Sequence, residues 1–134
     1  MIVVDTNVIA YLFLPGEHSD VARRAFLRDP SWAAPALWRS ELRSVLAISV
    51  RERGLRERDA VELFDAATDL MRGGEFGVNS ELVIHLAAAS NCSAYDCEFV
   101  ALALELDVPL VTADRRILRE FGDHSVRLED FTKE

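Results

Sequence analysis

The stretch from Ile2 to Asn7 constrains the fold of this chain more than any other. Residues 2–4 are all branched and apolar, which suits a strand buried on both faces of a parallel sheet. The run stops at Asp5, and Thr6 and Asn7 follow it as residue types that cap helices well. Open α/β sheets bind ligands where strands end and helices begin. The sequence therefore predicts that Asp5 lies at a ligand site.

A second strand of the same kind, residues 109–112, is followed by another acid, Asp114. Weaker strands are expected at residues 32–34, 76–78 and 126–128. Because strands alternate with helices throughout, the sequence predicts right-handed crossovers and a parallel sheet of about five strands in a three-layer α/β/α fold. The helices are expected near residues 8–14, 19–28 (capped by Ser19), 35–53 (opened by Pro35), 56–71, 80–90 (capped by Ser80), 93–104 and 114–122.

The helix expected at 35–53 carries a glutamate on an apolar face. Leu37, Glu41, Val45 and Ile48 recur at helical spacing and so share one side of the helix. A carboxylate on a buried face is costly unless it is paired, hydrogen-bonded or bound to metal. Glu41 is therefore a candidate functional residue.

Two interpretations of Asp96 stay open. Ser93 and Asp96 have the spacing of a capping box, in which both residues serve the start of a helix. Asp96 also shares a helical face with Val100 and Ala103, so its side chain is expected to point inward. Ser93 is interpreted as a helix cap, with a substrate contact as the alternative.

Four acids can meet at one edge of the predicted sheet. Asp5 and Asp114 follow strands, while Glu41 and Asp96 lie near helix starts, which βα units place at the same edge. Without cations, two carboxylates about 4 Å apart would repel by about 4 kcal/mol at an effective dielectric of about 20. Mg²⁺ and Mn²⁺ prefer oxygen ligands, and a pair of such ions can promote hydrolysis of a phosphodiester. The predicted chemistry is metal-assisted phosphodiester hydrolysis.

Composition narrows the class of protein. The net charge of −8 argues against nucleic-acid binding through a broad basic surface, but bound cations would reverse the field around clustered acids. The 134 residues suit one domain, residues 1–134, and neither a signal peptide nor a membrane-spanning run is evident. A cytoplasmic protein is expected. Cys92 and Cys97 are interpreted as packing residues, because two cysteines make a weak metal signal.

At these acids the chain resembles the PIN-domain ribonucleases. The similarity covers essentially the whole chain, and the length and intervening helices look most like the VapC toxins of toxin–antitoxin pairs. The segments that carry the resemblance, in the order and spacing of that family, are Val4-Asp5-Thr6-Asn7-Val8, Ser40-Glu41-Leu42, Tyr95-Asp96 and Val111-Thr112-Ala113-Asp114.

The resemblance implies a PIN-like, Rossmann-like fold and an endoribonuclease that depends on Mg²⁺ or Mn²⁺. It also implies a homodimer, a cognate antitoxin that neutralises the enzyme, and a higher toxin–antitoxin assembly as a further state. The residues that match the family's metal-binding and catalytic acids are Asp5, Glu41, Asp96 and Asp114. Thr112 matches a hydroxyl that supports the first aspartate, and Asn7 matches a polar position beside the site.

Weaker expectations and rival functions remain. Arg115 and Arg116 could contact RNA phosphates, although a solvated helix face explains them equally well. A catalytically silent PIN domain acting as a protein-interaction module is the alternative function. Proteins that become phosphorylated on an aspartate also place an acid after the first strand. Haloacid-dehalogenase-like enzymes usually have a second acid two residues later, where this chain has Asn7. Response-regulator receivers need a lysine late in the sheet, whereas the lone lysine of this chain, Lys133, lies at the tail.

Overall fold

The computed structural model describes residues 1–133 and contains a five-stranded, all-parallel sheet. The strands are β1 (Ile2–Val4), β2 (Trp32–Pro35), β3 (Glu75–Phe76), β4 (Leu110–Thr112) and β5 (Ser125–Arg127), in the order β3-β2-β1-β4-β5. The helices are α1 (Thr6–Phe13), α2 (Ser19–Arg28), α3 (Leu37–Arg53), α4 (Glu57–Leu70), α5 (Ser80–Ala88), α6 (Ala94–Leu106), α7 (Arg115–Glu120) and α8 (Leu128–Phe131). The predicted parallel sheet and three-layer α/β/α class are confirmed.

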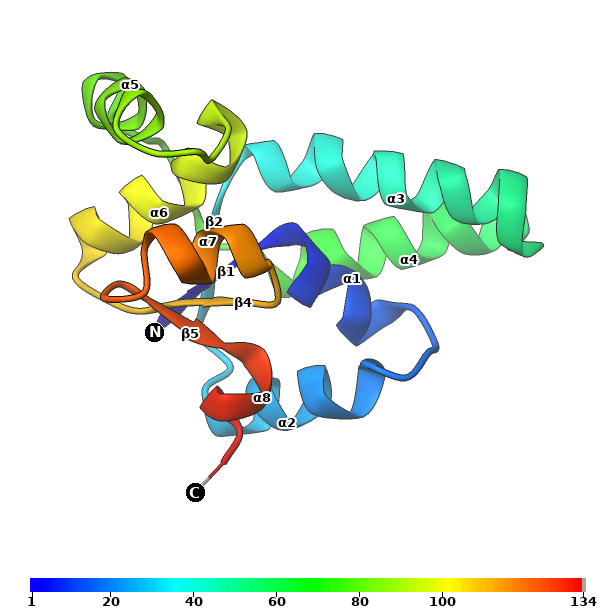
Figure 1. Cartoon of the computed structure of the whole chain (residues 1–134). Helices are drawn as coiled ribbons and strands as arrows, with labels where there is room; N and C mark the ends of the chain where they lie inside the picture. The colour runs from blue at the N-terminus through cyan, green and yellow to red at the C-terminus, as the bar shows by residue number, and fades with distance from the viewer. Residues whose placement is uncertain (134) are drawn as a thin grey trace.

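The order of the strands reverses between β1 and β4. From β1 the chain moves outward to β2 and β3, and it then returns to place β4 on the other side of β1. Figure 1 shows α2 and α8 on one side of the sheet and α5, α6 and α7 on the other. The carboxyl ends of β1 and β4 therefore flank the point where helices diverge to opposite faces, which is where open α/β sheets bind ligands.

Helices α3 and α4 lie side by side and project from the sheet as a long hairpin (Figure 1). The fully buried stripe of α3 consists of Trp38, Leu42 and Leu46. Glu41 lies one position away and is half-buried, and on its stripe Leu37 and Val45 pack against the edge of the core while Ile48 is exposed. The expected core-facing stripe is therefore only partly buried. Helix α3 packs against α1, α4 and β2, and the Trp38 stripe is the part of α3 that these neighbours cover most completely.

Several expected boundaries also need correction. Ser19 and Ser80 are the first residues of their helices, whose caps are His18 and Asn79; Asn79 Oδ1 accepts the hydrogen bond from Leu82 N. Pro35 ends β2 rather than opening α3. Helix α8 was not expected, and β3 and β5 each begin one residue earlier than predicted. Within residues 1–133, no helix is both long enough and apolar enough to cross a bilayer.

Candidate functional site

Asp5 connects the first strand to the first helix. It follows β1 and caps α1, where its Oδ1 accepts a hydrogen bond from the backbone N–H of Val8 at 3.1 Å. The residue is 7% exposed, so its carboxylate is almost fully removed from water. The strand of apolar residues thus delivers an acid to the carboxyl edge of the sheet, and the helix cap fixes its orientation.

Thr112 joins Asp5 to Asp114. This fully buried threonine ends β4, and its hydroxyl donates a short hydrogen bond to Asp5 Oδ2. Thr112 Oγ1 also accepts a hydrogen bond from the backbone N–H of Asp114 at 2.9 Å. Asp114 then caps α7, with its Oδ1 accepting from the backbone N–H of Ile117 at 3.0 Å. One hydroxyl therefore fixes the relative positions of the two strand-end acids.

Glu41 is held by a different threonine. The hydroxyl of Thr6, the first residue of α1, donates a hydrogen bond of 2.7 Å to Glu41 Oε1 on α3. Thr6 is buried, so the contact is shielded from water. The sequence suggested Thr6 only as a capping residue, because nothing in the local pattern shows that α3 would pass beside it.

The structure shows how the two interpretations of Asp96 combine. Ser93 is the N-cap of α6, and its Oγ accepts a hydrogen bond from the backbone N–H of Asp96 at 3.1 Å. The Asp96 carboxylate forms no reciprocal hydrogen bond with Ser93 in the described chain. It lines the same pocket as the other acids instead. Ser93 thus caps the helix, while Asp96 faces the site.

These four acids line a single pocket of about 250 Å³. We call it the acid pocket. Two of its members come from the ends of β1 and β4, one from α3 and one from the first turn of α6. The residues that line it are Asp5, Thr6, Asn7, Glu41, Ser44, Val45, Ile48, Asp96, Phe99, Asp114 and Ile117. Sequence reasoning had not identified Phe99 and Ile117 as part of the site, because an apolar wall residue looks like any other core residue. It had also missed Thr6 there, because that role depends on the contact with Glu41 on another helix.

Burial and mutual repulsion disfavour charge in the acid pocket. Burial raises the pKa of Asp5 to about 6, although the hydrogen bonds from Thr112 and Val8 act to lower it. Repulsion from the Asp114 and Glu41 carboxylates adds to the increase. Burial likewise raises the pKa of Glu41, with further repulsion from Asp96. Within residues 1–133, no lysine, arginine or histidine forms an ion pair with any of the four acids.

The oxygen atoms of the acid pocket suit a hard divalent cation. Across residues 1–133, no three histidine, cysteine, aspartate or glutamate side chains are gathered closely enough to form a ready-made metal cage. The acids instead surround the pocket, and Thr6 and Thr112 hold two of them in hydrogen bonds. Carboxylate oxygens accept more than one partner, and a cation would relieve their repulsion. The chemistry of the donor set, all carboxylate and hydroxyl oxygens, therefore fits a hard cation such as Mg²⁺ or Mn²⁺.

The residues predicted to support the acids or to contact the substrate differ in whether they line the acid pocket. Asn7 is exposed and lines the acid pocket, while Thr112 lies beneath it. Ser93 is absent from the pocket lining. Arg115 and Arg116 are exposed at the start of α7, beside Asp114, and neither forms an ion pair within the described part of the chain. Their contact with phosphate stays a prediction.

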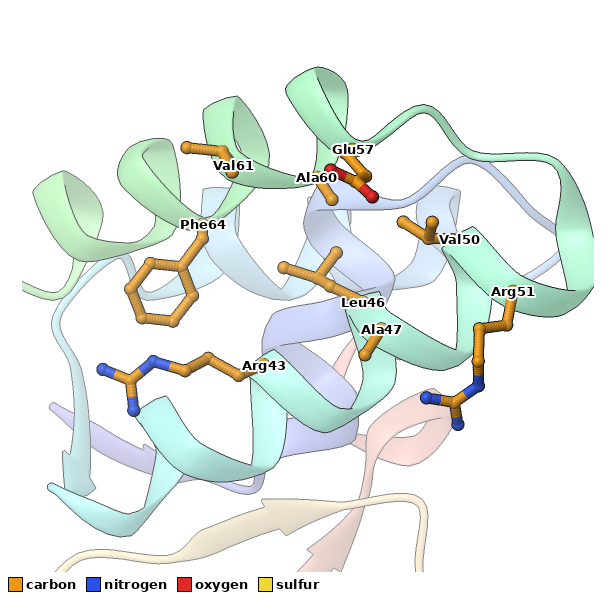
Figure 2. Close-up of a pocket in the computed structure, with 9 residues that line it drawn as sticks. All are labelled: Arg43, Leu46, Ala47, Val50, Arg51, Glu57, Ala60, Val61 and Phe64. Atoms are coloured by element: carbon orange, nitrogen blue, oxygen red, sulfur yellow. The ribbon is translucent and has the colours of Figure 1, made fainter.

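A separate hollow of about 530 Å³ lies between α3 and α4 (Figure 2). We call it the hairpin groove. Arg43 and Arg51 of α3 lie at its rim, and the Arg43 guanidinium lies 5.0 Å from the ring centre of Phe64. The floor and walls are largely apolar, and Val61 is 59% exposed. The groove is lined by Arg43, Leu46, Ala47, Val50, Arg51, Glu57, Ala60, Val61 and Phe64.

Comparisons with known proteins identify the family, a relative and a similar fold. Residues 2–122 match the model of the PIN domain. The chain is 28% identical over 123 residues to Ribonuclease VapC3 of Pyrobaculum aerophilum, covering 90% of this chain and 94% of that protein. Its fold is similar to the crystal structure of FitAcB from Neisseria gonorrhoeae, with a TM-score of 0.71 and 19% identity over 95% of this chain and 96% of that chain.

Proposed function

Because the chain belongs to the PIN-domain family, we propose that it is a Mg²⁺-dependent endoribonuclease and the toxin of a VapBC-type toxin–antitoxin pair. The name of its relative, Ribonuclease VapC3, supports the choice of RNA as substrate. The single observation that carries the proposal is the acid pocket, where four carboxylates meet without a cationic side chain from residues 1–133.

Each acid has a role set by its position. Asp5 and Asp96 are proposed as direct ligands of Mg²⁺ or Mn²⁺, with Glu41 and Asp114 completing the site directly or through water. When bound, such a cation lowers the pKa of water and offsets negative charge on the phosphate. Thr112 holds Asp5 and Asp114 in register, and Thr6 orients Glu41. Asn7, at the mouth of the pocket, is placed to orient the RNA backbone.

The alternative function is a catalytically silent PIN domain that only binds other proteins. The buried position of Asp5 argues against this alternative, because the raised pKa shows that its charge is unfavourable in the fold. A purely structural position would be filled more stably by a neutral residue. A site that uses cations gives the carboxylate a reason to be there.

Removal of divalent cations tests the proposed chemistry. We expect the purified chain to cut single-stranded RNA at discrete positions with Mg²⁺ or Mn²⁺, and to lose cleavage in EDTA, because the acids alone repel the phosphate. Re-addition of the cation should restore the same cut sites, as read by mapping RNA ends. Cleavage that continues in EDTA would point to a metal-independent contaminant or mechanism, and no cleavage with any divalent cation would support the silent-domain alternative.

The proposed antitoxin needs a docking surface, and the hairpin groove is suited to one. Within residues 1–133, Arg43 and Arg51 form no ion pair, so they and the apolar floor complement an apolar helix that carries acidic residues at its edges. We expect Val61→Asp to weaken binding of the cognate antitoxin about 10- to 100-fold, because it places a charge in the groove. Titration calorimetry measures this loss.

Cleavage of free RNA is the control for this variant, because Val61 lies outside the acid pocket and should leave it unchanged. Unaltered antitoxin affinity would remove the groove from the proposed interface.

The expected homodimer is measured separately, as a mass of twice the 15.0 kDa chain in sedimentation of the free protein.

A further inference from the structure

A third hollow adjoins the acid pocket. Its volume is about 480 Å³, within the range of roughly 300–1,000 Å³ for small-molecule sites. Asn7, Val45 and Ile48 line both hollows, so the two are neighbours with a shared wall. The remaining walls come from α1, the turn between α1 and α2, and the C-terminal part of α3. We call this hollow the side pocket.

An aromatic pair forms one wall of the side pocket. The rings of Tyr11 and His18 stack with centroids 4.5 Å apart and an interplanar angle of 29°. Glu17 Oε1 lies 3.3 Å from His18 Nε2 at the rim of this wall. The His18 side chain is 42% exposed, which leaves part of the stacked pair open to a ligand. Flat rings of this kind are the platforms on which unpaired nucleic-acid bases stack.

A positive charge lies at the far end of the side pocket. Arg53 is the last residue of α3 and is exposed. No carboxylate within residues 1–133 forms an ion pair with it. It follows Glu41 by twelve residues on the same helix, which separates the two backbone positions by about 18 Å along the helix axis at a rise of about 1.5 Å per residue. That length accommodates more than one nucleotide, since stacked nucleotides rise about 3.4 Å each.

We propose that the side pocket is a nucleobase subsite for single-stranded RNA. An unpaired base next to the reacting phosphodiester stacks on Tyr11 and His18, and a phosphate farther along the strand meets Arg53. The inference rests on the proposed nuclease function for its substrate class. Three features together favour RNA over a peptide, namely the stacked rings, an arginine that forms no ion pair within residues 1–133, and the wall shared with the acid pocket.

The test compares binding of two fluorescent oligomers to the full chain. One is an adenosine octamer, and the other is a matched octamer of ribose phosphate without bases. Both are measured by fluorescence anisotropy with Mg²⁺ present and with Asp5→Asn in every protein, so that no strand is cut. The ratio of the two affinities reports base contacts, because the phosphates are the same in both octamers.

We expect the adenosine octamer to bind more tightly, and Tyr11→Leu with His18→Leu to reduce this preference by about 5- to 150-fold, the range for loss of one stacked base. Tyr11→Phe and His18→Phe are the matched controls, because they retain flat rings and should retain the preference. Arg53→Gln should weaken both octamers by the same factor, which is the signature of a phosphate contact. Because His18 is partly exposed, His18→Leu alone provides the result if the double variant does not fold.

Two outcomes overturn the subsite. One is a base preference that is unchanged in the leucine variants, and the other is no binding of either octamer at millimolar protein. Failure of the proposed nuclease function looks different. In that case the chain without the Asp5 substitution cuts no RNA with Mg²⁺ or Mn²⁺, while the base preference and its loss in the leucine variants persist.

Discussion

Asp5→Asn is expected to lower RNA cleavage by at least about 1,000-fold. The carboxylate is proposed as a direct cation ligand, and an amide is a weaker, neutral one. Loss of about 4 kcal/mol of stabilisation of the developing charge corresponds to that factor in rate. Single-turnover cleavage of a mapped RNA, with chain in excess over substrate, measures the chemical step directly.

The fold of this variant should survive, because an asparagine can reproduce the contacts of the aspartate. Its Oδ1 can accept the hydrogen bond from Val8 N, and its Nδ2 can donate to Thr112 Oγ1. Asp65→Asn is the matched control, since it removes the same charge from an exposed position on α4 and should leave cleavage unchanged. Equal cleavage by wild type and Asp5→Asn would contradict the nuclease proposal, as would an equal loss in Asp65→Asn.

The metal-free chain is expected to become more stable as pH falls from about 6 to about 4. Burial raises the pKa of Asp5 from 3.8 to about 6, so the folded chain binds this proton more tightly than the unfolded chain does. The free energy of unfolding therefore falls as pH rises between those values, and above about pH 6 Asp5 contributes no further change. The shift of about two pKa units corresponds to a contribution of about 3 kcal/mol. Urea unfolding in EDTA at several pH values measures it.

Two comparisons assign this effect to Asp5. In Asp5→Asn the contribution between pH 4 and 6 should disappear, and the metal-free variant should be more stable than wild type at pH 8. At that pH, Mg²⁺ should raise the stability of wild type more than that of the variant, because the cation offsets the buried charge. A wild-type chain that loses stability as pH falls from 6 to 4, or a variant less stable than wild type in EDTA at pH 8, would contradict the assigned protonation of Asp5.

Activity and stability are thus expected to change in opposite directions at one residue. A buried carboxylate near three others weakens the metal-free fold, and the same arrangement suits the acid pocket to cations. Such a conflict is typical of functional sites. It also explains why Thr112 and Thr6 matter, since their hydroxyls lower the cost of holding Asp5 and Glu41 in place.

Glu41 shows the limit of reasoning from periodicity alone. Its spacing with Leu37, Val45 and Ile48 correctly placed these residues on one side of a helix. The fully buried side is the neighbouring stripe of Trp38, Leu42 and Leu46, however, because α3 packs on both α1 and α4 and Trp38 stacks on Phe64 of α4. Helical periodicity tells which residues share a face, whereas burial depends on which neighbour covers that face.

The sequence by itself determined the buried strands that precede Asp5 and Asp114, the alternation of strands with helices, and the family to which the acids belong. These features are local, since apolar runs, caps and spacings depend on residues close together in the chain. Only the tertiary structure decided that β1 and β4 are neighbours, which lets Thr112 donate its hydrogen bond to Asp5 across 107 residues of sequence. It also decided that Thr6 meets Glu41 and that Tyr11 stacks on His18 beside the acid pocket. Contacts of that kind follow from how the sheet and helices pack together, which no local pattern records.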